Sequence, residues 1–237
     1  MGEWRGTFPG PAGRPPDPAT WRHELGGGGW GDDQLQAYTD SPANAALTGA
    51  GQLAITARRE PDGSITSARL TTQGRVGVTH GSISTRVQVP GTPGSWAAVW
   101  MLGSDIDRVG WPACGEIDVM EHVGIAPREV HGTAHLPGHA GVGQGLGATY
   151  DAGVDLSDGF HDYAVTWAPD SISWSVDGVE YHRLDRGQTS TWPFEGEFFL
   201  LVNLAVGGSW PGHEGVVPQL PATLLVDHVV VTSSDPS

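Results

Sequence analysis

Short runs in which apolar and polar residues alternate recur along most of the chain. In one of them Leu53, Ile55 and Ala57 are separated by polar or small residues, and the segment from Phe160 to Trp167 alternates in the same way. A period of two is typical of a strand that buries one face. We predict strands over residues 52–58, 65–72, 76–90, 95–102, 116–121, 130–136, 160–167, 172–176 and 179–181. The mostly apolar segments 198–206 and 224–231 are typical of buried strands.

Turn-forming residues separate these runs. Asp177-Gly178 is a strong signal for a two-residue hairpin turn, and the segment 61–64 (Pro-Asp-Gly-Ser) predicts a second turn. Prolines and a four-glycine run at 26–29 predict an extended, loop-rich segment over residues 1–33. We find no amphipathic helix, internal repeat or obvious linker. The pattern therefore predicts a single all-β domain over residues 1–237, built as an antiparallel sandwich of two sheets.

The composition and net charge of the chain limit the kinds of molecule that it can bind. The chain has 36 glycines and 18 prolines in 237 residues, which suits many tight turns. A net charge of −15 argues against nucleic acid and anionic membranes as partners and is compatible with a neutral polymer. No segment is apolar enough to span a bilayer, and nothing suggests more than a monomer. The single cysteine, Cys114, excludes an internal disulfide and a cysteine-based zinc cluster, and we expect a buried free thiol.

Three carboxylates fall within six residues, at Glu116, Asp118 and Glu121. On a strand the first two share a face, but strict alternation would place Met120 rather than Glu121 beside them. Either Glu121 faces away as a solvated acid, or a β-bulge returns it to the face of the other two. In the second case the two glutamate Cα atoms lie roughly 13 Å apart, and inclined side chains could bring the carboxyl groups to about 5 Å. Retaining glycosidases use that separation, whereas the alternative is an acidic edge strand.

The segment Glu116–Glu121 matches the E-x-D-x-x-E signature of glycoside hydrolase family 16. Its flanks, residues 111–115 and 122–124, resemble the laminarinase (endo-β-1,3-glucanase) branch of that family, and the resemblance extends from about Pro9 to Thr232. It implies a β-jelly roll of two curved sheets with a substrate cleft on the concave face. It also implies a secreted enzyme that cuts β-1,3-glucan internally, with retention and without a cofactor.

Other readings remain open. Dedicated lichenases have the shorter form E-x-D-x-E, so Met120 as the extra residue favours β-1,3 specificity over mixed-linkage β-1,3-1,4-glucan. Galactan hydrolases share the longer motif but differ in its surroundings. A non-catalytic β-glucan-binding protein is the alternative from another class, although such proteins typically lack the three acids.

The resemblance assigns a role to each acid. Glu116 is the nucleophile, Glu121 is the acid/base, and Asp118 assists them. The assignment is physically reasonable, because the charge of one carboxylate disfavours ionisation of its neighbour and helps Glu121 keep its proton. Asp118 can share a proton or a hydrogen bond with Glu116 and so tune its ionisation.

Several further residues match cleft positions of the family. Tryptophans stack on sugar rings without needing charge, and we expect this of Trp100, Trp111 and Trp210. His135 matches a histidine near the leaving group, so we expect it to hydrogen-bond substrate. Arg69, Asn203 and Asn44 resemble residues that bind sugar hydroxyls. The alternatives are a surface arginine for Arg69 and a satisfied interior amide for Asn203. Alternating patterns place Trp96, Trp167 and Trp174 in the core and leave Trp21, Trp30 and Trp192 undecided.

Two features invite a metal interpretation. His131, His135 and His139 recur every four residues, but the glycines and proline among them argue against the helix that would align them, so we do not expect a transition-metal site. Asp227 interrupts an apolar strand. It is either an edge-strand charge or, as the resemblance implies, a ligand of a structural calcium ion together with backbone carbonyls.

The glycine-rich segment 141–147 superficially resembles a nucleotide-binding loop. It lacks the strand-then-helix context and the lysine that such loops need. We therefore expect a flexible loop at the edge of the cleft.

Overall fold

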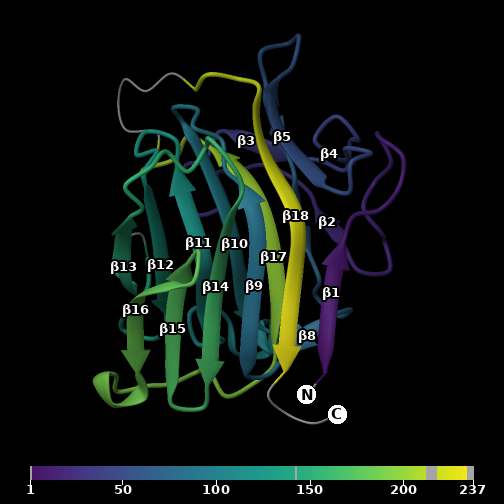
Figure 1. Ribbon diagram of the computed structural model, residues 1–237. Helices are drawn as coiled ribbons and strands as arrows, with labels where there is room; N and C mark the ends of the chain where they lie inside the picture. Colours follow the sequence, from purple (N-terminus) through teal and green to yellow (C-terminus); the bar gives the residue numbers. More distant parts are fainter. Residues whose placement is uncertain (1, 142, 212–217, 234–237) are drawn as a thin grey trace.

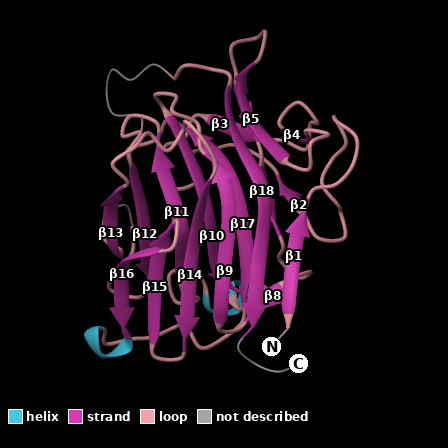
Figure 2. Cartoon of the chain, in the orientation of Figure 1, coloured by secondary structure: helices cyan, strands magenta, loops and turns pink. Residues whose placement is uncertain are grey.

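The computed structural model describes residues 2–141, 143–211 and 218–233. Almost all regular structure in these ranges is strand (Figure 2), apart from the short helix α1 (Ile106–Val109) and the 3-10 turn η1 (Arg186–Gln188). None of the described helices has the length and apolar character that a membrane crossing requires. The all-β prediction is confirmed.

The strands form two sheets that lie face to face (Figure 1). The larger, ten-stranded sheet runs in the order β16 (Val179–Asp185), β15 (Ser171–Val176), β14 (His161–Ala168), β9 (Gly81–Gln88), β18 (Ala222–Ser233), β5 (Leu53–Arg59), β6 (Ile65–Ser67) and β3 (Gln36–Tyr38), with β1 (Glu3–Thr7) beside β18 and β4 (Ala45–Leu47) beside β5. The smaller, eight-stranded sheet runs in the order β13 (Leu146–Asp151), β12 (Glu129–His135), β11 (Glu116–Val123), β10 (Ser95–Gly103), β17 (Phe198–Val206), β7 (Arg69–Thr71) and β2 (Arg22–Glu24), with β8 (Gly77–Val78) beside β17. Among the described strands, neighbours pair antiparallel except β3 with β6. The jelly-roll sandwich that the resemblance implied is present.

One hydrophobic core fills the space between the sheets. The ten-stranded sheet contributes Ile83 and Val165 to it, and the eight-stranded sheet contributes Val99 and Val130. Fully burying an aliphatic side chain of this size stabilises the fold by about 1.5–3 kcal/mol. Strand β17 is buried along its whole length, which explains why its sequence is apolar except at Asn203.

Three of the predicted elements differ from the structure. The strand expected over 76–90 divides into β8, which pairs with β17, and β9, which pairs with β14 and β18 in the other sheet. The strand expected over 65–72 divides at the buried Ala68. Its first part, β6, forms a hairpin with β5, and its second part, β7, pairs with β17 in the other sheet. Residues 1–33, expected to be irregular, contribute the short strands β1 and β2, whose pairing with distant strands no local pattern could reveal.

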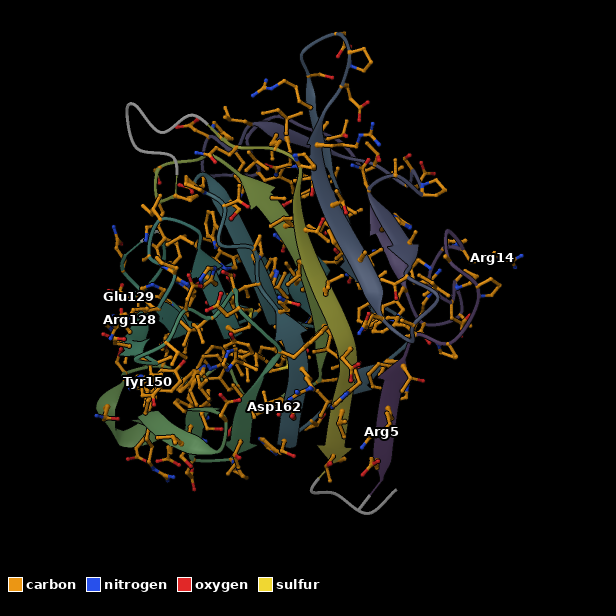
Figure 3. The ribbon with its side chains drawn as sticks, turned by 45° about the horizontal axis from the view of Figure 1, so that its top comes forward. Arg5, Arg14, Arg128, Glu129, Tyr150 and Asp162 are labelled. Atoms are coloured by element: carbon orange, nitrogen blue, oxygen red, sulfur yellow. The ribbon has the colours of Figure 1, made fainter. Side chains whose placement is uncertain are left out.

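Charged side chains lie on the outer surfaces. Figure 3 shows Arg5 and Asp162 over the ten-stranded sheet, and Arg128 and Glu129 at the edge formed by β12 and β13. Arg86 pairs with Asp162 at 2.7 Å. Exposed pairs of this kind contribute little to stability, so the core carries the fold.

The Asp177-Gly178 turn joins β15 and β16 as predicted. Both residues have positive φ, 47° for Asp177 and 79° for Gly178, which a type I′ turn requires.

Gly178→Ala should lower the free energy of unfolding by about 1–2 kcal/mol, because an added Cβ disfavours the left-handed conformation. Gly196→Ala is the matched control, since an added Cβ there meets nothing within 4 Å and its φ is not left-handed. Urea unfolding measures both variants. Equal midpoints would contradict the turn assignment.

Candidate active site

The three acids of β11 lie at the centre of the eight-stranded sheet, on the face away from the core. The strand register places each acid between two neighbours: Leu102 and His135 flank Glu116, Trp100 and Thr133 flank Asp118, and Ala98 and His131 flank Glu121. The register shifts between Asp118 and Glu121 on the β12 side and between Val99 and Trp100 on the β10 side. These shifts form a β-bulge, the second of the two alternatives that the sequence left open, and they return Glu121 to the face of Glu116 and Asp118.

The bulge differs from the prediction in one detail. Met120 pairs with Val99, so Val119 rather than Met120 is the residue without a partner on β10. On the other side Val119 and Met120 together oppose Gly132. Both side chains are buried in the core, Val119 at 1% exposure and Met120 at 0%. Because of the bulge, two consecutive side chains point into the core, and the side chain of the following residue, Glu121, lies on the outer face.

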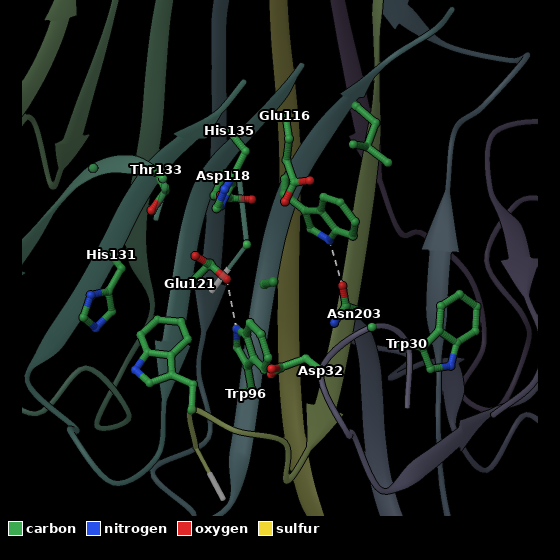
Figure 4. A pocket seen from close by; sticks show the side chains of 18 of the residues that line it. Trp30, Asp32, Trp96, Glu116, Asp118, Glu121, His131, Thr133, His135 and Asn203 are labelled. Carbon is green, nitrogen blue, oxygen red and sulfur yellow. Dashed lines mark hydrogen bonds and ion pairs between the residues drawn. The ribbon is translucent and has the colours of Figure 1, made fainter. Parts of the chain in front are cut away.

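The register also builds the floor of a cleft. From β12 to β2, the row through Glu121 runs across six strands as His131, Glu121, Ala98, Asn203, Arg69 and Glu24. All but Glu24 line a cleft of about 820 Å³ (Figure 4), which Glu116, Asp118, Trp96, Trp100, Trp111 and Trp210 also line. Polar groups and aromatic rings therefore line a groove that crosses the strands.

Indole N–H groups orient the two glutamates. Trp111 Nε1 donates to Glu116 Oε2 at 2.7 Å, and Trp96 Nε1 donates to Glu121 Oε1 at 3.1 Å. Trp111 is 45% exposed, so its ring is available to a ligand. The core prediction for Trp96 is wrong, because alternation along β10 separates its two faces without telling which one meets the core.

The other tryptophans are now placed. Trp210 packs edge-on against Trp96, with ring centroids 5.3 Å apart, and against His131 at 4.6 Å. Trp30, which the sequence left undecided, lines the cleft, whereas Trp21 is buried. Trp192 is partly buried against the core, and Trp167 and Trp174 are core residues as predicted.

Arg69 and Asn203 both reach the cleft. The Arg69 guanidinium lies 4.8 Å from the Trp30 ring and 4.6 Å from the Trp100 ring, and it pairs with Glu24. Asn203 is only 6% exposed and accepts a hydrogen bond from Trp100 Nε1 at 2.8 Å. Arginine stacked between two indoles fixes the spacing of both rings. The sequence left Trp30 undecided and gave no signal for Glu24.

Asn44 does not lie in the cleft, which contradicts its assignment to substrate binding. Its side chain is buried, and its amide nitrogen donates to the Thr56 carbonyl and to Thr66 Oγ1, each at 3.0 Å. Thr39 donates to its amide oxygen at 2.5 Å. It is a satisfied interior amide that ties β4 to its neighbours.

His135 stands beside the acids, with Nε2 3.3 Å from Asp118 Oδ2. The three histidines spaced four apart do not converge. In the described part of the chain, the only group of acid, histidine and cysteine side chains close enough to share a metal ion is Glu116, Asp118 and His135. Burial lowers the pKa of His131 to about 4, so its ring is neutral.

The sequence also made predictions for Asp227 and for the glycine-rich segment 141–147. Asp227 sits where the register of β18 shifts against β9, and its carboxylate accepts a hydrogen bond from His228 Nδ1 at 2.8 Å. Gly141, Gly143, Gly145 and Gly147 line the cleft, but the expected loop ends at residue 145, because Leu146 and Gly147 belong to β13; residue 142 lies outside the described residues.

The three acids hold protons more tightly than free carboxyl groups do. Burial, followed by the charge of Asp118, raises the pKa of Glu116 to about 8, while His135 and the Trp111 hydrogen bond oppose the rise. Burial raises the pKa of Asp118 to about 7, and its hydrogen bond with Glu116 opposes this. Burial and the charges of Asp118 and Glu116 raise the pKa of Glu121 well above its ordinary value. The site therefore keeps a proton on at least one acid at neutral pH.

Comparison with known proteins agrees with this geometry. The family described as glycosyl hydrolases family 16 matches residues 33–220. A beta-glucanase from Rhodothermus marinus is 42% identical over 230 residues, covering 91% of this chain and 80% of the relative. A glucan endo-1,3-beta-glucosidase from Cryptopygus antarcticus is 36% identical over 220 residues, covering 84% of this chain and 78% of the relative.

The fold agrees as well. The X-ray structure of the laminarinase from Rhodothermus marinus superposes with a TM-score of 0.89 at 39% identity, covering 97% of this chain and 96% of that one. The match extends over the sheet that carries the three acids and over the sheet behind it. The chain belongs to glycosyl hydrolase family 16 and is a glycoside hydrolase.

Proposed function

We propose that this glycoside hydrolase cuts β-1,3-glucan within the polymer chain and retains the anomeric configuration. The bulge in β11 carries the proposal, because it places Glu116 and Glu121 on one face of the cleft. Two relatives support the substrate, since one is named as a glucan endo-1,3-beta-glucosidase and the other as a laminarinase. A groove that crosses six strands suits a polymer better than a single sugar.

In the first step Glu121 is the acid. Its raised pKa keeps the carboxyl protonated when the substrate arrives, so it can give its proton to the departing glycosidic oxygen. The hydrogen bond from Trp96 occupies one carboxyl oxygen and leaves the other for the substrate.

Glu116 attacks the anomeric carbon as the anion. The hydrogen bond from Trp111 and the nearby His135 both favour that anion. Asp118, hydrogen-bonded to Glu116, can take the proton that the two carboxyl groups share. Once Glu116 becomes an ester it loses its charge, and Glu121 can act as the base that activates water.

The substrate is neutral in this proposal. Among the described residues that line the cleft, the acidic side chains are Asp32, Glu116, Asp118 and Glu121, and the basic one is Arg69. A bound anionic polymer would add negative charge beside acids whose pKa values burial and mutual repulsion already raise, whereas neutral glucose rings can stack on the indoles.

We further propose that residues 1–237 act as one monomeric catalytic domain outside the cell. The continuous core between the two sheets supports the single domain. The size of a polysaccharide, which cannot cross a membrane, supports the location.

Structural calcium at Asp227 is a separate proposal. The carboxylate lies at a register shift and is half-exposed, so a cation could approach it. Among the described residues it forms no cluster with other acids, so backbone carbonyls would have to complete the ligand set.

Incubation with laminarin, lichenan and agarose tests the proposed function. Laminarin should release reducing sugar fastest, and proton NMR of its first products should show the β anomer, because double displacement inverts the anomeric carbon twice. Initial α product would contradict retention. Faster cleavage of lichenan or agarose would contradict the substrate.

Glu116→Ala and Glu121→Ala should each lower kcat on laminarin by at least about 100-fold, with the fold intact by circular dichroism. Azide separates the two roles when an activated aryl glycoside is the substrate. It should give the α-glycosyl azide with Glu116→Ala and the β-glycosyl azide with Glu121→Ala. Glu180→Ala, at an exposed acid, should keep wild-type activity. The opposite azide products would reverse the assignment.

Glu121→Gln should stabilise the protein at pH 7 by about 1 kcal/mol or more, which raises Tm by roughly 2–4 °C per kcal/mol. The folded-state pKa of Glu121 lies above its unfolded value, so the wild type loses stability as pH rises between the two. Below about pH 4 the carboxyl is protonated in both states and the gain should vanish. Thermal melts at both pH values check this, with Glu180→Gln as the control. A variant no more stable than wild type at pH 7 would be inconsistent with the raised pKa.

If calcium binds at Asp227, adding a chelator should lower the Tm of the wild type. Asp227→Ala should have the lower Tm already and should not respond to chelator. A wild-type Tm that does not change with chelator would remove calcium as a stabiliser.

A further inference from the structure

The bulge in β11 sends one backbone carbonyl away from the strand ladder. The Asp118 carbonyl accepts a hydrogen bond at 2.8 Å from the indole N–H of Trp174, which lies on β15 in the opposite sheet. Ladder carbonyls point along the sheet toward the next strand, so one that reaches the opposite sheet must be turned toward the core. A buried carbonyl without a partner is unfavourable, and here the partner is supplied from across the core.

The strand beside the bulge makes room for this indole. Gly132 on β12 is the single residue that opposes Val119 and Met120. A Cβ added at Gly132 would lie 2.4 Å from Trp174 Cδ1 and 2.3 Å from the Tyr181 hydroxyl. The neighbouring core positions of β12 carry Val130 and Ala134. Glycine at 132 is therefore explained by the close approach of Trp174, since its φ is not left-handed.

The hydrogen bond lies next to the acid/base. Glu121 follows the Asp118 carbonyl by three residues, and the intervening Val119 and Met120 are packed in the core. If the peptide between Asp118 and Val119 rotates so that its carbonyl points toward a neighbouring strand, the backbone that leads to Glu121 must rotate with it. The Glu121 side chain then leaves its place beside Trp96.

We propose that Trp174 is a positioning residue for hydrolysis, because its indole N–H holds the Asp118 carbonyl toward the core and so keeps Glu121 aimed into the cleft. This inference rests on the proposed function. Trp174 is 0% exposed and cannot touch substrate, so it acts only through the bulge.

Trp167 provides a matched control. It is also a buried tryptophan of the ten-stranded sheet, at 1% exposure, and its indole also donates to a backbone carbonyl, that of Phe194 at 3.0 Å. Phe194 lies in the loop before β17 rather than on β11. The two tryptophans differ mainly in which carbonyl they hold.

The experiment compares Trp174→Phe with Trp167→Phe in the full chain, with laminarin as the substrate. Trp174→Phe should lower kcat by about 10- to 100-fold with KM within about threefold, since a displacement of about 1 Å in a catalytic group can cost 100-fold. Trp167→Phe should lower thermal stability to a similar extent and leave kcat within about threefold. Equal kcat in the two variants would overturn the proposal.

A second readout does not depend on activity. The 13C signal of the Glu121 carboxyl can be titrated in each variant. In Trp174→Phe its pKa should fall, because Glu121 moves away from the charges of Asp118 and Glu116 and toward solvent. The other titratable groups facing Glu121 are His131 and His135 on β12 and Tyr181 on β16. An unchanged titration would overturn the proposal even if laminarin proves not to be the substrate.

Two further variants separate the loss of the indole N–H donor from a general loss of folding. Benzothienylalanine at position 174 keeps the ring shape and removes only the N–H donor, and it should reproduce the loss of kcat. Gly132→Ala should also lower kcat by displacing the indole, whereas Gly159→Ala, where a Cβ meets nothing within 4 Å, should not. Wild-type kcat in the benzothienylalanine variant would overturn the role of the N–H. An inactive wild type with an altered Glu121 titration would instead overturn the proposed substrate alone.

Discussion

One extra residue in a central strand determines the geometry of this site. A regular strand would turn Glu121 toward the core, where an acid beside aliphatic side chains would be strongly disfavoured. The bulge at Val119 and Met120 places two apolar residues inward and returns the acid to the cleft. Pairing on both sides of β11 resumes beyond the bulge, so the surrounding ladder fixes its position.

The rest of the cleft follows from the same sheet. Cross-strand pairs place Asn203, Arg69 and Glu24 in line with Glu121 without any shared sequence motif. Indole N–H groups then fix the glutamates from the side of the cleft, and an indole from the opposite sheet holds the bulge from below. Tryptophans thus have two roles in this fold: their apolar rings line the cleft, and their indole N–H groups donate hydrogen bonds.

Sequence reasoning reached the fold and the three acids because both depend on local patterns. Alternation marks strands, and a break in alternation at Met120 marked the bulge, although the unpaired residue proved to be Val119. Alternation does not tell which face meets the core, so Trp96 was misplaced. Asn44, Trp30 and Glu24 depend on contacts between distant segments, which spacing along the chain does not reveal. The sequence predicted that neighbouring acids would raise the pKa of Glu121, but burial, which is the larger cause, exists only in the assembled cleft.

The central claim is that the bulge sets Glu116 to attack the anomeric carbon while Glu121 protonates the leaving group. Covalent trapping tests it most directly. A 2-deoxy-2-fluoro β-1,3-linked disaccharide with an activated leaving group should form a long-lived ester, because fluorine slows the second displacement. Peptide mass spectrometry should then find the disaccharide on Glu116 and leave Glu121 unmodified. A label on Glu121, or hydrolysis of the reagent without any labelled peptide, would contradict the account.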